Sequence, residues 1–341
     1  MKRIGPISIL ALLGIITFAF SLHSCKNNKK KQDKVVNLAI DKKTEIKNKK
    51  SFHTSKHIGI GGTLSEQWKK SDSLYTHTST KKLIELASDQ DDVIESLIAF
   101  RALLMKNPHK AVNLAISEID DTTNVSTLAG CCRENDCVSN VRISMIQYAR
   151  KYYKVSLADS IRIDSALLFS NYPSKFYYIY HLYHKLPAKP EYEKRLLQLY
   201  KHDQYALIAL ARYHRVATKQ EIIRLLSKIS KNINIDNRDT INTVLDAVTT
   251  WPSESYKHQV IKVCQHILNN PDTRGCYRNV FGALMAYNDK WSYNYIDKTL
   301  SKAIKEKQVS FATCYSFLEA YEANPLPLFK PLVQKYKISL E

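Results

Sequence analysis

Glycine is scarce in most of this chain. The sequence contains 8 glycines in 341 residues, and only Gly130, Gly275 and Gly282 lie beyond residue 78. Phosphate-binding loops and tight hairpin turns depend on glycine, because its backbone adopts conformations that other residues avoid. The scarcity therefore argues against a nucleotide-binding protein with a glycine-rich loop, and against a doubly wound sheet built around such a loop.

The motifs of common enzyme classes are also missing. The chain has no Gly-x-Ser-x-Gly nucleophile turn, no phosphate-binding P-loop and no His-Glu-x-x-His zinc motif. No stretch shows a sustained alternation of apolar and polar residues, which is the pattern of a half-buried strand. The sequence therefore predicts a protein that is not an enzyme, with no cofactor and no metal ion.

The one long apolar run lies at the start of the chain. Lys2 and Arg3 precede the apolar segment of residues 7–20, and no further charge occurs before Lys26. A basic start followed by an apolar core shorter than the ~20 residues of a membrane span is the pattern of a signal peptide. An uncleaved membrane anchor is the alternative.

The residues after this run resemble the bacterial lipoprotein box. In that motif a Leu three residues before a Cys, and a small residue directly before it, guide cleavage and lipidation. Leu22, Ser24 and Cys25 match this pattern, whereas His23 stands where a small or β-branched residue is usual. The resemblance implies a signal peptide over residues 1–24, a lipid on Cys25 and a place in the bacterial cell envelope, with the membrane as a partner through that lipid.

Lysine dominates the segment after the predicted lipidation site. Residues 26–60 hold eleven lysines against three acidic residues, a local balance of +8 within a net charge of +19 for the chain. Such a segment buries too little apolar surface to offset its ordering entropy, so we expect residues 25–78 to be a flexible tether. A short amphipathic helix over residues 35–40, lying on the membrane, is the alternative. Lys26 differs from the Asp that retains lipoproteins at the inner membrane of enteric bacteria, which favours the outer membrane.

Helical periodicity fills the remaining residues, 79–341. Apolar residues recur at helical spacing over residues 92–105, in a stripe wide enough for a helix buried between neighbours. Asn107-Pro108 marks one helix start, and Thr218-Lys-Gln-Glu221 is a capping-box pattern that marks another. Further helices are expected at about 138–153, 157–169, 174–185, 190–201, 203–214, 236–250, 253–268, 274–286, 291–306 and 309–322.

Weak similarity between segments of the chain indicates an internal repeat. Acidic turns at residues 91–92, 120–121 and 203 are each followed by an apolar stretch. This pattern resembles the HEAT-type repeat over residues 79–305, although Ile94 stands where that repeat often has Arg. The alternative TPR repeat has a Trp/Leu/Gly/Tyr signature that is absent here. The resemblance implies an all-α fold, an α-solenoid or superhelical stack of antiparallel helix pairs with a concave face.

Cysteine pairing is possible if the chain is exported. Seven cysteines occur, and one of them is the predicted lipidation site. The spacing Cys-Cys-x4-Cys is not that of a zinc knuckle, so disulfides or free thiols are favoured over metal. The candidate disulfide couples are Cys131 or Cys132 with Cys137, and Cys264 with Cys276.

Aromatic side chains crowd residues 172–183. Aromatics give contact area at low entropy cost and are favoured in binding grooves, although they also make good core. His181 and His184 lie one helical turn apart in the same region, and ordinary helix-face histidines are favoured over a zinc site. The candidate partner-binding residues are Tyr172, Phe176, Tyr177, Tyr180 and Tyr183.

Together these patterns predict an envelope-anchored helical-repeat scaffold that binds another, unidentified protein. A more specific version is an immunity-type protein that neutralises a toxin at the envelope. The contrasting classes are a HEAT-like enzyme, since some HEAT-like proteins are DNA glycosylases, and a binder of nucleic acid or cell-wall polymer, which the positive charge invites. A signal peptide would remove the protein from cytoplasmic DNA, so nucleic acid is the less favoured partner.

Overall fold

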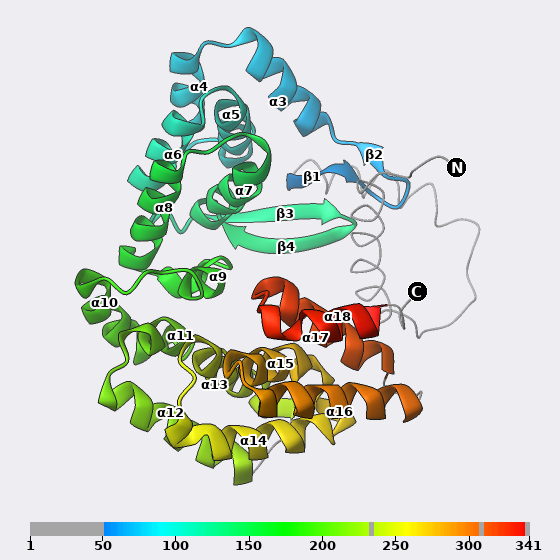
Figure 1. Ribbon diagram of the computed structural model, residues 1–341. Helices are drawn as coiled ribbons and strands as arrows, with labels where there is room; N and C mark the ends of the chain where they lie inside the picture. The colour runs from blue at the N-terminus through cyan, green and yellow to red at the C-terminus, as the bar shows by residue number, and fades with distance from the viewer. Residues whose placement is uncertain (1–50, 232–234, 307–309, 338–341) are drawn as a thin grey trace. The chain divides into compact units, whose positions relative to one another are not determined.

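The computed structural model describes residues 51–231, 235–306 and 310–337. The predicted leader, Cys25 and the first half of the predicted tether lie outside these residues. Contacts divide the chain at Ser51, and all the elements described belong to the unit that begins at Phe52. This unit is mainly helical, as predicted, and also contains a small sheet (Figure 1). None of its described helices is both long and apolar enough to cross a membrane.

The described residues form sixteen α-helices and five short 3-10 helices. The first eight α-helices and the first 3-10 helix are α3 (Glu66–His77), α4 (Thr80–Ala87), α5 (Val93–Lys106), α6 (Pro108–Ser117), α7 (Val138–Tyr152), α8 (Leu157–Phe169), η2 (Pro173–Lys175), α9 (Ile179–Tyr183) and α10 (Pro190–Tyr200). The others are α11 (Ala206–Leu210), η3 (Ala211–Tyr213), α12 (Val216–Lys231), η4 (Ile235–Asn237), α13 (Arg238–Thr250), α14 (Glu254–Leu268), η5 (Pro271–Cys276), α15 (Tyr277–Ala286), α16 (Lys290–Glu306), α17 (Ser310–Ala323), η6 (Pro327–Phe329) and α18 (Lys330–Lys337).

The sheet was not predicted from the sequence. Its four strands lie in the order β2 (Thr63–Leu64), β1 (Phe52–Ile58), β3 (Asn124–Gly130) and β4 (Cys132–Cys137). β1 pairs antiparallel with β2 and parallel with β3, and β3 pairs antiparallel with β4. Four of the six residues of β4 are exposed, so this strand carries no buried apolar face that a period-two pattern would reveal.

Residues 52–77 were predicted to belong to the tether, but they form β1, β2 and α3. Phe52 is fully buried in a cluster that includes Leu97, Ile98 and Val125. Ser65 caps α3 by accepting a hydrogen bond from the Trp68 amide. The predicted tether therefore extends too far, because contacts with distant apolar residues order a segment whose composition is largely polar.

α5 is the central helix of the first half of the unit. It contacts α3, α4, α6 and α7, and every residue from Ser96 to Leu104 is buried. Asp92 caps its N-terminus, accepting hydrogen bonds at 3.1 Å from the amides of Ile94 and Glu95. The prediction of a helix buried between neighbours at residues 92–105 is thus confirmed.

A row of helices organises the second half. α11 contacts α13, α13 contacts α15, and α15 contacts α17; we call these four helices the odd row (Figure 1). α12, α14 and α16 each contact the helix of the odd row that follows them in the chain.

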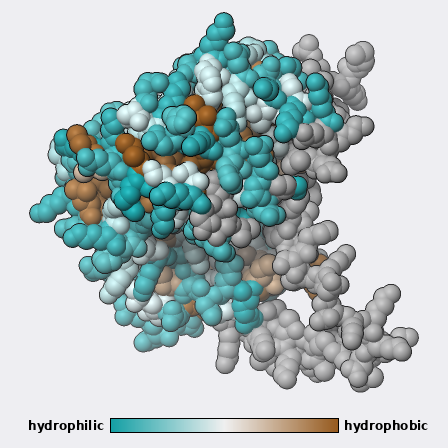
Figure 2. Space-filling view, turned by 90° about the horizontal axis from the view of Figure 1, so that it is seen from below, coloured by the Kyte–Doolittle hydropathy of each residue, from teal (hydrophilic) through white to brown (hydrophobic). Residues whose placement is uncertain are grey.

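Figure 2 shows that the face seen from below is mainly hydrophilic, with hydrophobic residues gathered in small areas.

Several local predictions were wrong. The helix expected at 174–185 is the 3-10 helix η2 followed by the five-residue α9, and the helix expected at 203–214 is the five-residue α11 followed by η3. α12 begins at Val216, so Thr218 lies inside the helix and is buried rather than serving as its cap. Glu221 bonds instead to Tyr200 Oη and Arg224. The acidic turn at residues 120–121 leads into strand β3, not into a helix. This segment therefore does not have the structure that the proposed repeat predicts.

Candidate functional site

The aromatic segment divides between core and surface. Phe176 and Tyr183 are buried, and Tyr183 Oη donates a hydrogen bond to Asp203 Oδ2 at 2.9 Å. Tyr172 and Tyr177 are exposed, and Tyr180 is partly buried. The structure therefore does not place the five candidate partner-binding residues on one common surface.

Tyr180 belongs to a hydrogen-bond network centred on a buried carboxylate. Asp246 Oδ2 accepts a hydrogen bond at 2.6 Å from Tyr180 Oη, and its Oδ1 accepts one at 2.7 Å from Asn279 Nδ2. His184 Nε2 lies 3.3 Å from the same Oδ2. Burial, followed by the adjacent Asp246 carboxylate, raises the pKa of Tyr180, so the phenol remains a donor at neutral pH. The network ties α9 to α13 and α15.

A groove of about 550 Å³ opens beside this network, and we call it the row groove. Its walls come from α9, η3, α13, α15 and α17, so it runs across successive helices of the odd row. The lining residues are Tyr180, His181, His184, Lys185, Arg212, Asp246, Thr249, Thr250, Arg278, Asn279, Gly282, Met285, Ala320, Ala323 and Asn324.

Cationic groups outnumber acidic groups in the row groove. Lys185 and Arg278 are exposed, and neither forms an ion pair with any described residue. Burial, followed by the neighbouring side chains of His184, Lys185 and Arg278, lowers the pKa of His181. Arg212 Nη1 donates to the Tyr183 carbonyl at 2.7 Å, so this cation also holds the backbone of α9. Because Asp246 is the groove's one acid, the groove favours a negatively charged ligand.

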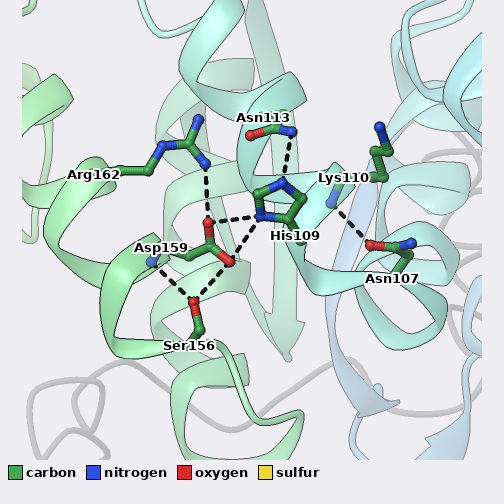
Figure 3. Close-up of polar contacts among 7 residues, drawn as sticks. All are labelled: Asn107, His109, Lys110, Asn113, Ser156, Asp159 and Arg162. Carbon is green, nitrogen blue, oxygen red and sulfur yellow. Dashed lines mark hydrogen bonds and ion pairs between the residues drawn. The ribbon is translucent and has the colours of Figure 1, made fainter.

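A second polar cluster contains the residue types of a hydrolase triad. His109 Nδ1 lies 2.9 Å from Asp159 Oδ1, and Ser156 Oγ donates to Asp159 Oδ2 at 2.9 Å (Figure 3). In a serine hydrolase the His stands between the Ser and the Asp, because it must take the hydroxyl proton. Here the Asp stands between the other two, so Ser156 has no base. The cluster instead joins the start of α6 to the start of α8.

Asp159 gives this cluster an acid-sensitive contribution to stability. Burial alone would raise its pKa, but hydrogen bonds from Ser156, His109 and Arg162 outweigh burial and lower the pKa below 3.8. A carboxylate with a lowered folded-state pKa stabilises the protein above its unfolded pKa, and this stabilisation is lost as the pH falls through the folded-state value.

We therefore expect Asp159→Asn to lower the free energy of unfolding by about 1–2 kcal/mol at neutral pH, since the charged acceptor is lost. The difference from the wild-type protein should shrink below pH 3.8, where the unfolded-state carboxyl becomes protonated. Urea unfolding at a series of pH values measures this difference. A difference that is unchanged at about pH 2.5 would contradict the assignment.

The described cysteines are free thiols, so the candidate disulfides are not formed in this structure. Cys132 and Cys137 stand at opposite ends of β4. At a rise of about 3.3 Å per residue, five steps separate their Cα atoms by roughly 16 Å, far beyond disulfide reach. Cys264 and Cys276 are both buried, and burial raises the pKa of the Cys276 thiol to about 11. An inert structural role therefore fits this pair.

The histidines that prompted the zinc alternative do not converge on a metal site. His181 and His184 both line the row groove. His214, which lies nearby in the sequence and could have supplied a third imidazole, instead stacks its ring on Trp251 with centroids 4.8 Å apart. Across residues 51–231, 235–306 and 310–337, no three metal-ligating side chains are grouped as a metal site requires.

No family model, curated protein or solved structure matches this chain. The candidate site is therefore defined by its own geometry. The sequence pointed to Tyr180, His181 and His184 but missed Asp246 and Asn279, which complete the network. Each missed residue is an isolated polar position on an otherwise ordinary amphipathic helix, so no local pattern marks it.

Proposed function

We propose that this protein is a lipid-anchored envelope protein whose helical body is an α-solenoid that binds a partner protein. The contacts along the odd row support the solenoid, because each of its helices packs on the next and a partner helix packs behind it. The resemblance of Leu22, Ser24 and Cys25 to a lipoprotein box supports the anchor. An immunity-type role is the more specific form of the same proposal.

The row groove carries the proposal. Three successive helices of the odd row, α13, α15 and α17, contribute to it together with α9 and η3, as expected of the binding face of a stacked array. Tyr180 supplies a partly buried aromatic surface, and Lys185 and Arg278 supply unpaired positive charge. Aromatic and Arg side chains are the residue types that contribute most to protein interfaces. We infer that the bound segment is an acidic stretch of the partner protein.

Charge reversal in the groove tests this function. We expect Lys185→Glu combined with Arg278→Glu to weaken partner binding by at least roughly tenfold, because each reversal replaces attraction by like-charge repulsion. The matched control is Lys228→Glu with Lys262→Glu, which changes two exposed lysines on α12 and α14, away from the groove.

In-cell photocrosslinking provides the measurement. A crosslinking amino acid at the exposed groove residue Asn324 should capture one reproducible protein, and the same residue at His258 on α14 should not. The groove variant should lose this product while the control variant keeps it. Equal capture by both variants would contradict the groove assignment, and capture of nucleic acid or cell-wall polymer alone would contradict the protein-binding class.

A further inference from the structure

A second cavity, of about 640 Å³, lies against the sheet, and we call it the sheet pocket. β1, β3 and β4 contribute Lys56, Thr127 and Glu134, and the helices α3, α5 and α7 contribute Trp68, Arg101 and Met145. None of these residues lines the row groove. The sheet pocket is therefore a separate site that the proposed function does not use.

Arg101 is the unusual residue of this pocket. Its side chain is 4% exposed, and its guanidinium carbon lies 4.5 Å from the ring centre of Phe52 and 4.2 Å from that of Trp68. Nη2 donates to the His53 carbonyl, but Nη1 is buried without a hydrogen-bond partner among the described residues. The indole Nε1 of Trp68 is likewise buried and without a partner in that part of the chain.

Two unpaired donors at one place are costly. A buried donor without an acceptor costs about 1–3 kcal/mol, and more when the donor is charged. Burial lowers the pKa of Arg101, but a guanidinium remains protonated at neutral pH. The two aromatic rings offset part of this cost by cation–π attraction. They accept no hydrogen bond in the guanidinium plane, so Nη1 still lacks an acceptor.

The described acids near the pocket form no ion pair with Arg101. Asp72 attracts its charge from a distance, but this attraction is outweighed by burial, which lowers the pKa of Arg101. Asp136 accepts hydrogen bonds from Asn140 Nδ2 and from the Cys137 amide, and Glu134 is exposed at the pocket's edge. Arg101 forms no ion pair with any described residue. Lys56, also exposed, adds a further positive charge at the edge.

The remaining walls indicate the body of the ligand. Leu104, Val141 and Met145 line the pocket together with the rings of Tyr148 and Tyr153. Such walls favour an apolar ligand body, and the few polar groups among them fix its orientation. The guanidinium carbon of Arg101 lies 4.2 Å from the Trp68 ring centre, so an acceptor with two oxygens at one end would satisfy both Arg101 Nη1 and Trp68 Nε1.

We propose that the sheet pocket binds a small organic carboxylate with an apolar body. One carboxylate oxygen accepts from Arg101 Nη1 and the other from Trp68 Nε1, while the apolar body lies against Leu104, Val141 and Met145. Arg–carboxylate pairing in a site removed from water is among the strongest hydrogen-bonding arrangements in proteins.

The test compares acids with their neutral amides. The full-length protein in lipid nanodiscs is titrated by calorimetry with octanoate and 4-phenylbutyrate, and then with octanamide and 4-phenylbutyramide. Empty nanodiscs correct for partition into lipid. We expect at least one acid to bind, and its amide to bind at least roughly tenfold more weakly. Equal binding of acid and amide, or no binding of either acid, would overturn the proposal.

Two variants assign any binding to this pocket. Arg101→Met should weaken binding of the acid at least roughly tenfold while leaving the amide unchanged. Ser144→Trp, at an exposed residue of α7 that lines the pocket, should block both by filling the cavity without removing Arg101. The matched control is Ser73→Trp, at an exposed residue of α3 outside the pocket. Undiminished acid binding by Ser144→Trp would place the ligand elsewhere and overturn the proposal.

Discussion

Replacing Arg142 with methionine is expected to lower the free energy of unfolding by about 3 kcal/mol, because it removes the buried partner of a part-buried ion pair together with two buried hydrogen bonds. Arg142 is 2% exposed, and its Nη1 is paired with Glu118. Nη2 donates to the Ala87 carbonyl at 2.7 Å and to Ser96 Oγ at 3.1 Å. This one side chain, on α7, therefore joins the ends of α4 and α6 to α5.

Methionine keeps the length and the apolar stem of Arg142 but leaves the Glu118 carboxylate without its partner. Glu118→Gln should also be destabilising, and the double variant should lose less stability than the sum of the two single variants, because the two side chains interact directly. Arg224→Met provides the control, since Arg224 pairs with Glu221 at an exposed surface and should contribute little. Urea denaturation of all four variants gives the comparison. A loss below about 1 kcal/mol for Arg142→Met would show that this pair does not hold the four helices together.

The helices were predictable because their signals are local. The predicted helix at residues 157–169 has the bounds of α8, and Ser156 caps it as a sequence rule requires. The helix expected at about 190–201 likewise corresponds to α10, which begins at Pro190. Periodicity and end signals occupy a few consecutive residues, so they can be recognised without knowing which distant residues the helix contacts.

The sheet was not predictable for the opposite reason. β1 is ordered by parallel pairing with β3, whose partners Phe52 and Thr127 lie 75 positions apart in the chain. No short-range pattern encodes that pairing. The lysine-rich composition before it pointed toward disorder, and the single buried Phe52 was too weak a signal to oppose that prediction.

The candidate site was predictable only in part. Tyr180 and His184 were visible as members of a conspicuous aromatic and histidine cluster, but their acceptor, Asp246, comes from a helix more than sixty residues later. Arg101 could not be predicted as a site residue either. A single Arg in an apolar helix does not indicate that the rings of Phe52 and Trp68, from two other elements, stack on it. Both sites depend on tertiary packing, which composition and spacing do not report.

Replacing Cys25 with serine is expected to abolish lipid attachment completely and to block removal of residues 1–24. Serine has no thiol to carry a thioether-linked lipid, and the lipoprotein box that Leu22, Ser24 and Cys25 resemble implies that cleavage depends on this Cys. Metabolic labelling with an alkyne fatty acid and the intact mass of the purified protein measure the two effects. Wild-type protein should carry the label and begin at Cys25, whereas the variant should be unlabelled and its mass should match a chain that retains residues 1–24 without lipid.

Cys131→Ser is the matched control, because Cys131 is an exposed thiol that the proposal leaves unmodified. It should keep both the label and the mature mass. An uncleaved membrane anchor predicts the reverse for the wild-type protein, which would then begin at Met1 and carry no label on Cys25. If the lipid is present, the lysine-rich segment that follows it supplies a second attraction to anionic headgroups, at about 1 kcal/mol per lysine near the surface. Salt screens the attraction of the lysines but does not weaken the insertion of a lipid into the membrane. The labelled protein should therefore resist extraction by high salt, whereas a chain beginning at Lys26 should be released by it.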